Sequence, residues 1–256
     1  MIIGLIPARY QSSRLPGKPL LKFGHETMIQ KVYKQTCLAS KIDKVYVLTD
    51  DDRVAESVRV IGGNTLMITE KCLNGTERIC HALKKYPDIF KDARYIVNVQ
   101  GDEPFINPDH IDLAIAKMIE CNVKCNDDRV KCTTLHYRID KIEDLANRSI
   151  GKLILNTKDC IMYCSRNCIP ANKTGIPDTT RVNYYGHIGL FVFDLDYLKN
   201  HYLGQDYPLQ VEEDIEWLKL LEQGYDIVSV KVDNYEIGVN LPEDYNYLVK
   251  KYYSQE

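Results

Sequence analysis

The chain lacks long apolar runs. None of its apolar stretches approaches the roughly 20 residues that a membrane-spanning helix needs. The start Met1-Ile2-Ile3-Gly4 carries no cationic residue of the kind that begins a secretory signal peptide. We therefore expect a protein that does not insert into membranes and that has a cytoplasmic location.

An excess of positive charge is also missing. The formal net charge is −3, which argues against a nucleic-acid-binding protein that relies on overall charge, although it leaves room for a local basic pocket. The nine cysteines include no C-x-x-C pair, and no histidine is arranged to complete a metal site with them. Buried or half-buried thiols in a reducing cytosol are the simpler interpretation.

The chain of 256 residues is long enough for one large domain, and its 45% hydrophobic and 27% charged content is ordinary for a globular protein. In its first half, short apolar runs alternate with helical patterns, which favours an α/β fold with a doubly wound, mostly parallel sheet. The expected strands are 2–6, 44–49, 64–68 and 94–99, and the expected helices are 27–40, 51–61, 75–86 and 108–121.

From about residue 130 the pattern changes. Residues 159–166 are expected to pair with 152–155 as a hairpin, and the polar segment 167–183, with two prolines and a glycine, is expected to be a mobile loop. The other expected strands are 131–137, 189–193 and 227–232, and the expected helices are 212–223 and 242–252.

A cationic loop follows the first predicted strand. Arg9, Arg14 and Lys18 lie in it with two serines and Gly17, and a helical pattern begins at Met28. A strand, a cationic loop and a helix can bring fixed cations and backbone N–H groups onto the phosphates of a nucleoside triphosphate. The Walker A pattern G-x-x-x-x-G-K-[ST] is absent, so a P-loop hydrolase is not expected.

Polar groups in three segments, 7–18, 49–50 and 100–103, lie just after predicted strands. Ligands of doubly wound sheets bind beyond the carboxyl ends of the strands, so we expect these segments to share one site. A strand-end carboxylate such as Asp102 suits a hard cation like Mg²⁺, although it can also serve as a helix cap before Pro104.

Several sequence blocks together resemble one known family. They are Ile6-Pro7-Ala8-Arg9 with Ser13-Arg14-Leu15-Pro16-Gly17-Lys18, Val47-Leu48-Thr49-Asp50, Asn74-Gly75-Thr76-Glu77-Arg78, Gln100-Gly101-Asp102-Glu103-Pro104, Ser165-Arg166, His187-Ile188-Gly189, Glu212-Glu213-Asp214-Ile215-Glu216, and Gly238-Val239 with Pro242-Glu243-Asp244. In kind and in order they are similar to the motifs of the CMP-Kdo synthetases (3-deoxy-manno-octulosonate cytidylyltransferases), which belong to the nucleotide-sugar transferase superfamily. The resemblance covers nearly the whole chain.

The resemblance implies an enzyme that transfers CMP from CTP to the anomeric hydroxyl of a 3-deoxy sugar acid, with Mg²⁺ as cofactor and release of pyrophosphate. It implies one domain over 1–256, in which about 130–205 is a smaller lobe that covers the sugar and forms a homodimer. It implies that Arg14, Lys18 and Asp102 are catalytic and that the metal is held at Asp102 and position 240. The implied CTP-binding residues are Pro7, Ala8, Arg9, Ser13, Arg14, Lys18, Thr49, Asp50, Asn74, Gly75 and Thr76. The implied sugar-binding residues are Arg78, Gln100, Arg166, His187, Glu216 and Trp217.

Some of these residues have a second interpretation. Arg78 can reach the ligand, or it can pair with Glu77 or an exposed acid. His187, taken alone, is more typical of a structural histidine. The acidic run that includes Glu216 is, taken alone, more typical of the start of a helix.

Two positions depart from the family pattern. Asn240 stands where the family has a metal-binding aspartate, and an amide oxygen carries no charge. Trp217 stands where the family has a sugar-contacting glutamine, and its indole can stack on a sugar or simply fill the core. The substrate is therefore Kdo or a close relative, with another acidic sugar, a phosphonate or a non-catalytic nucleotide-binding role as alternatives.

Overall fold

The computed structural model describes residues 1–12, 14–124 and 128–253. They form two compact units. The first unit comprises Met1–Asp112, Asp194–Leu203 and Glu236–Glu256, and the second comprises Leu113–Phe193 and Gly204–Tyr235. The second unit thus begins before residue 130 and continues past 205, and it excludes the short segment 194–203.

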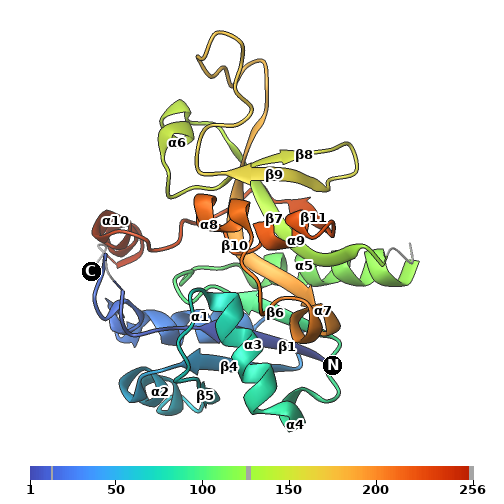
Figure 1. The fold of residues 1–256 in the computed structure, drawn as a ribbon. Coiled ribbons are helices and arrows are strands. Elements are labelled where there is room, and N and C mark those ends of the chain that lie inside the picture. The colour runs from blue at the N-terminus through green and yellow to red at the C-terminus, as the bar shows by residue number, and fades with distance from the viewer. Residues whose placement is uncertain (13, 125–127, 254–256) are drawn as a thin grey trace. The chain divides into compact units, whose positions relative to one another are not determined.

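The first unit is built on a parallel sheet. β1 pairs with β4 and with β6, and β4 pairs with β5, which gives the order β6-β1-β4-β5 with every pair parallel (Figure 1). The strands are β1 (Ile2–Pro7), β4 (Lys44–Thr49), β5 (Thr65–Met67) and β6 (Tyr95–Val99), with a small hairpin of β2 (Lys22–Phe23) and β3 (Glu26–Thr27). The core of β1 and all of β6 are buried, as their continuous apolar runs predict for a sheet covered on both faces.

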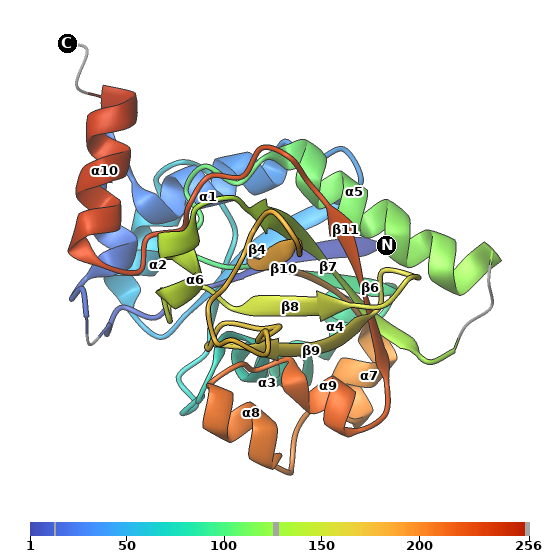
Figure 2. The same ribbon diagram turned by 90° about the horizontal axis from the view of Figure 1, so that it is seen from above.

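Helices cover both faces of this sheet. The chain steps outward from β1 to β4 to β5 and then returns to β6 on the other side of β1. Because crossovers are right-handed, this reversal places α1 and α3 on opposite faces, as Figure 2 shows. The helices are η1 (Lys18–Leu20), α1 (Met28–Cys37), α2 (Asp52–Arg59), α3 (Gly75–Lys85), α4 (Pro87–Phe90), α5 (Pro108–Ile119), α7 (Leu195–Asn200) and α10 (Pro242–Tyr253), and the unit boundary falls within α5.

Side-chain caps fix where these helices begin. Thr27 and Gln30 form a reciprocal capping box at the start of α1, the Asp51 carboxylate accepts from the Arg53 N–H at α2, and Asn74 accepts from the Glu77 N–H at α3. The start that the sequence predicts for the second helix, at residue 51, is thereby confirmed, with Asp51 as its cap.

A separate aromatic cluster holds α10 in the first unit. Phe23, Met28, Val239 and Leu248 form a buried cluster. Phe23 meets Phe105 and Tyr245 edge-on, at ring-centroid distances of 5.6 and 5.1 Å. This packing fixes the segment that enters α10 against the hairpin of β2 and β3.

The second unit contains a mixed sheet. β7 pairs in parallel with β11 and antiparallel with β10, and the antiparallel pairs β8–β9 and β8–β10 extend it. The predicted hairpin is confirmed, with Lys152 opposite Ser165. Its elements are η2 (Glu120–Lys124), β7 (Val130–Ile139), α6 (Ile142–Ala146), β8 (Lys152–Leu155), β9 (Ile161–Ser165), β10 (Tyr184–Asp194), α8 (Pro208–Glu213), α9 (Leu218–Glu222) and β11 (Asp226–Lys231).

The single helix predicted over 212–223 is wrong. The chain forms α8 and α9 instead, because Asp214 adopts a left-handed conformation with φ 50° and ends α8. Tertiary contacts stabilise this break, since the Glu213 carboxylate and the Glu213 and Asp214 carbonyls all accept hydrogen bonds from Arg166. Sequence periodicity carries no sign of such contacts.

The mostly parallel α/β architecture expected from the sequence is confirmed. Short elements with weak periodicity were missed, among them α4, α6, α7 and the hairpin of β2 and β3. Across the described residues, no helix combines the length and the apolar character that crossing a membrane requires.

Candidate functional site

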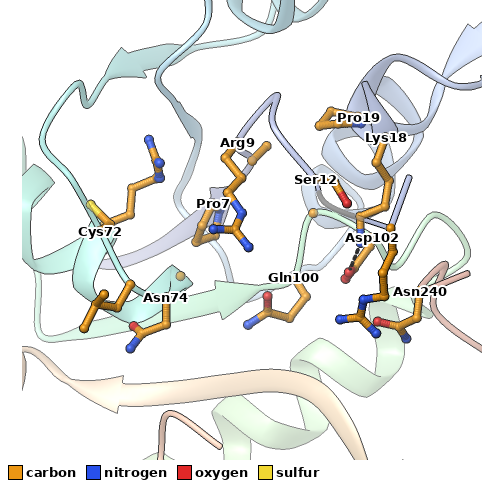
Figure 3. A pocket seen from close by; sticks show the side chains of 16 residues that line it. Pro7, Arg9, Ser12, Lys18, Pro19, Cys72, Asn74, Gln100, Asp102 and Asn240 are labelled. Atoms are coloured by element: carbon orange, nitrogen blue, oxygen red, sulfur yellow. Dashed lines mark hydrogen bonds and ion pairs between the residues drawn. The ribbon is translucent and has the colours of Figure 1, made fainter. Parts of the chain in front are cut away.

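A polar pocket opens at the carboxyl ends of β1 and β6, in the first unit. The chain runs outward from β1 to β5 and then returns to β6, so the strand order reverses between β1 and β6. Ligands of doubly wound sheets usually bind at this point. In Figure 3, Cys72 and Asn74 lie at one end, Lys18, Asp102 and Asn240 at the other, and Arg9 and Gln100 between them. Its lining residues are Pro7, Ala8, Arg9, Ser12, Arg14, Lys18, Pro19, Cys72, Leu73, Asn74, Gly75, Arg78, Gln100, Gly101, Asp102 and Asn240.

The close approach of two strand ends forms one wall of this pocket. A Cβ on Gly101 would lie 2.7 Å from the carbonyl oxygen of Pro7, so no larger residue fits there without a shift of backbone. At Gly75, by contrast, a Cβ would meet Pro7 at an ordinary 3.4 Å. Gly101 is therefore what lets β1 and β6 bring Arg9 and Asp102 into one pocket.

Tyr10, which belongs to the cationic loop, anchors this loop to Arg53 of α2. The guanidinium of Arg53 lies 3.5 Å from the centre of the Tyr10 ring, and the same guanidinium pairs with Asp51 at 2.7 Å. Gly17 has φ 70°, where a glycine is favoured, and its Cβ position faces the Tyr10 hydroxyl. This turn leads directly into η1 and sets Lys18 in the pocket.

Lys18 and Asp102 meet at the end of the pocket that Asn240 also lines. The Lys18 ammonium donates to Asp102 Oδ2 at 2.6 Å and to the Val239 carbonyl at 3.0 Å. Both side chains are mostly buried, with exposed fractions of 18% and 25%. Residues 84 positions apart in the sequence thus form one charged pair, which the sequence analysis did not foresee.

The entrance to α10 places Asn240 beside this pair. The Val239 N–H donates to the Asp102 carbonyl at 2.8 Å, and Asp244 accepts from the N–H groups of Asn240 and Leu241. Asn240 lines the same pocket as Asp102. The carboxylate and the amide oxygen are the kind of hard donors that Mg²⁺ takes, so the residues fit the implied metal.

Arg78 lines the pocket and is also anchored behind it. Its guanidinium donates to the Ile68 carbonyl at 2.7 Å and to Asp50 Oδ2 at 3.0 Å, and the side chain is almost fully buried. Arg78 thus pairs with an exposed acid, Asp50, and not with Glu77. Because Arg78 also lines the pocket, its contact with the ligand stays a prediction. Asp50 and Thr49 do not line the pocket. Asp50 instead forms an ion pair with Arg78, which does line it, and Thr49 is buried.

Asn74 and Thr76 also have structural partners. Asn74 caps α3 and accepts from the Tyr202 hydroxyl at 3.3 Å, while Thr76 is buried and accepts from the Asn98 amide at 3.1 Å. Asn74 and Gly75 line the pocket, and Thr76 lies behind them.

Sequence reasoning missed five lining residues: Ser12, Pro19, Cys72, Leu73 and Gly101. Cys72 donates to the Glu70 carbonyl, and burial raises the pKa of its thiol. No motif marks it, so the sequence alone gave no signal. Ser13, predicted to bind CTP, and Cys125 lie outside the described residues. The other cysteines are free thiols, and no cluster of three or more metal-binding side chains occurs in the described part of the chain.

The remaining predicted sugar residues, Arg166, His187, Glu216 and Trp217, belong to the second unit. Arg166 donates to the carbonyls of Arg148, Glu213 and Asp214. Its N–H and the hydroxyls of Ser165 and Tyr163 donate to the Glu213 carboxylate. Although burial acts to raise it, these hydrogen bonds hold the pKa of Glu213 below its usual value.

His187 and Trp217 pack together. Their ring centroids are 5.2 Å apart, Phe191 stacks on His187 at 5.0 Å, and Trp217 is only 2% exposed. Trp217 therefore fills the core of this unit and supports His187 from behind. Burial, helped by the charge of Arg166, lowers the pKa of His187 to about 3, so its imidazole is neutral. Its Nε2 is buried with no hydrogen-bond partner in the described part of the chain.

Comparison with known proteins places the chain in a family. The family model described as cytidylyltransferase matches residues 3–229. The 3-deoxy-manno-octulosonate cytidylyltransferase of Protochlamydia amoebophila is 40% identical over 95% of this chain and 91% of its own, and the mitochondrial enzyme of that name from Arabidopsis thaliana is 39% identical over 95% and 80%.

A solved structure agrees. The structure of CMP:2-keto-3-deoxy-manno-octonic acid synthetase complexed with CTP covers 100% of this chain and 99% of its own, with a TM-score of 0.86 and 29% identity. A cytidylyltransferase from Leptospira borgpetersenii, 19% identical with a TM-score of 0.62, shares the fold. The chain therefore belongs to the 3-deoxy-manno-octulosonate cytidylyltransferase (CMP-Kdo synthetase) family of nucleotidyltransferase enzymes.

Proposed function

We propose that this protein transfers CMP from CTP to the anomeric hydroxyl of a 3-deoxy sugar acid, Kdo or a close relative, and releases pyrophosphate. The observation that carries the proposal is the cationic pocket at the switch point of the parallel sheet, in a chain that matches relatives of this name over nearly its full length. We further expect the homodimer and the cytoplasmic location that the resemblance implies.

In this reaction the sugar hydroxyl attacks the α-phosphorus of CTP, the bond from that phosphorus to the bridging oxygen breaks, and the hydroxyl loses its proton. Little covalent work falls to the protein, so positioning and charge neutralisation dominate. Arg14 and Lys18 neutralise the β- and γ-phosphates, and Arg9 lies nearer to the α-phosphate. The three cations come from one loop, which the Tyr10 and Arg53 contact supports.

Magnesium is the expected cofactor. Asp102 and Asn240 would hold it, and when bound it would neutralise charge on the phosphates. Cytosine would be read from Asn74 and Gly75, which both line the pocket. Asn74 lies at the end opposite Asp102 (Figure 3).

Gln100 and the second-unit residues Arg166, His187 and Glu216 would bind the sugar acid. The Arg166 guanidinium already donates to protein carbonyls, so a sugar carboxylate would have to use its remaining N–H donors or replace one of these contacts. His187 has a neutral imidazole and an Nε2 that can still form a hydrogen bond, which suits a sugar hydroxyl.

Pyrophosphate release with CTP, ATP or GTP and a panel of sugar acids, including Kdo and a phosphonate, tests this function. We expect release with CTP and a 3-deoxy sugar acid, since a site that hydrogen-bonds one base rejects others by leaving polar groups unpaired. Equal rates with ATP would overturn the nucleotide assignment. Binding of CTP without turnover of any acid would indicate a non-catalytic protein.

A further inference from the structure

The pocket as a whole has a charge balance that does not favour binding of a free divalent cation. Among the described lining residues, Arg9, Arg14, Lys18 and Arg78 are cationic, and Asp102 is the one carboxylate. Arg78 has its own partner in Asp50, but the other cations come from the loop that faces the pocket. An ion arriving alone would meet like charges before it reached a ligand.

The one carboxylate is already paired. Lys18 donates to Asp102 Oδ2 at 2.6 Å, and its second bond, to the Val239 carbonyl at 3.0 Å, holds the ammonium in place. Val239 is itself tied to Asp102 through its N–H. The ammonium therefore occupies the coordination space beside Oδ2 that a metal ion would need.

Asn240, the second expected metal ligand, does not compensate for the pairing of Asp102 with Lys18. Asn240 is a neutral amide, so a divalent ion that displaced Lys18 would gain one charged ligand and one dipole. It would also leave the Lys18 ammonium partly buried beside a new positive charge, which is costly.

We propose that Lys18 acts as a specificity-determining residue that keeps divalent metal off Asp102 until the nucleotide arrives. This inference rests on the proposed function. The triphosphate supplies new anionic partners for the Lys18 ammonium, which has a flexible stem. It supplies phosphate oxygens to the metal at the same time. Metal and nucleotide then bind with positive coupling, each raising the affinity for the other by the same factor.

The test measures Mn²⁺ binding to the whole protein without nucleotide, by electron paramagnetic resonance of the free ion. We expect weak binding to the wild-type protein. Lys18→Met should bind Mn²⁺ at least about tenfold more tightly, because it removes a competing charge within hydrogen-bond distance of the ligand. Lys22→Met is the matched control: it removes one charge at the exposed Lys22 of strand β2 in the same unit and should bind Mn²⁺ as the wild type does.

Two further variants make the result specific. Lys18→Arg keeps a cation that can pair with Asp102 and should bind as weakly as the wild type, which excludes a general effect of altering position 18. Adding Asp102→Asn to Lys18→Met should abolish the gain, which places the ion at Asp102. Circular dichroism and thermal melting check that each variant is folded.

The proposal is overturned if the wild-type protein and Lys18→Met bind Mn²⁺ equally without nucleotide, or if Lys22→Met gains as much as Lys18→Met. The pyrophosphate assay separates this from failure of the proposed function. An active wild-type enzyme with no gain in Lys18→Met refutes the role of Lys18 alone. A gain in Lys18→Met in a protein that does not turn over CTP supports the exclusion of metal and refutes the function.

Discussion

At the scale of single residues, Asp102 forms an ion pair with Lys18 of the cationic loop and is the expected metal ligand. Asp102→Asn removes the charge that pairs with Lys18 and that would hold the metal. We expect turnover to fall by roughly two to four orders of magnitude. The melting temperature should change little, because the amide oxygen of an asparagine at position 102 can still accept the hydrogen bond from Lys18.

Steady-state pyrophosphate release and a thermal melt measure both effects. The exposed Asp109, changed to Asn, is the control and should keep the wild-type rate. A near-normal rate for Asp102→Asn would remove Asp102 from the catalytic residues.

Asn240 is one of the two residues at which this chain departs from the family pattern, and it is the one expected at the metal. Asn240→Asp restores a second carboxylate beside Asp102, so we expect it to lower the magnesium concentration needed for half-maximal rate. Asn107→Asp is the control, because it adds the same charge in the same unit and keeps the hydrogen bond that position 107 accepts from the Asp109 N–H. It should leave the magnesium dependence unchanged. An unchanged magnesium dependence in Asn240→Asp would mean that position 240 does not contact the metal.

At the scale of elements, the pocket depends on how closely the ends of β1 and β6 approach. Gly101→Ala would place a methyl carbon 2.7 Å from the Pro7 carbonyl oxygen. We expect it to lower the free energy of unfolding by about 1–3 kcal/mol and to weaken CTP binding, because Arg9 and Asp102 follow these strand ends.

Gly75→Ala is the comparison, since its Cβ would meet only ordinary contacts at the start of α3. Its stability should match the wild type within about 0.5 kcal/mol. Urea unfolding measures both variants, and equal midpoints for the two would refute the close-approach argument.

The second element that builds the site is α10. Its aromatic and aliphatic contacts with Phe23 and Met28 hold Val239 in the core. Val239 in turn accepts from Lys18 and donates to Asp102. A helix at the end of the chain thus sets the geometry of charged groups contributed by its beginning and middle.

At the scale of the whole molecule, two histidines predict how stability depends on pH: His136, which is buried, and His187, which is partly buried. Burial lowers the pKa of His187 to about 3 and that of His136 to about 4, from 6.5. Below pH 6.5 the unfolded chain binds protons that the native protein does not, so the free energy of unfolding decreases as the pH falls toward 4. About one pH unit above 6.5 these histidines are almost entirely neutral in both states and contribute almost no pH dependence.

Urea unfolding between pH 7 and pH 5 tests this prediction. Each histidine contributes at most about 1.4 kcal/mol per pH unit. His187→Phe, which keeps an aromatic ring against Phe191 and Trp217, should have a smaller slope, whereas a variant of the exposed His25, His25→Gln, should keep the wild-type slope. Parallel slopes for all three proteins would contradict the assignment to His187.

The sequence by itself determined the alternation of strands and helices in the first unit and the cap at Asp51, because periodicity and capping are local properties of the chain. It also determined that the cationic loop and Asp102 follow strand ends. In a parallel sheet, that alone brings them to one edge.

Only the tertiary structure decided which charges meet. The Lys18–Asp102 pair and the Arg78–Asp50 pair join different strand ends. Asp214 breaks a helix because Arg166 binds the carbonyls at its end. Trp217 is a core residue because His187 and Phe191 surround it. Each of these depends on contacts between residues far apart in the chain, and neither local propensity nor motif spacing encodes such contacts.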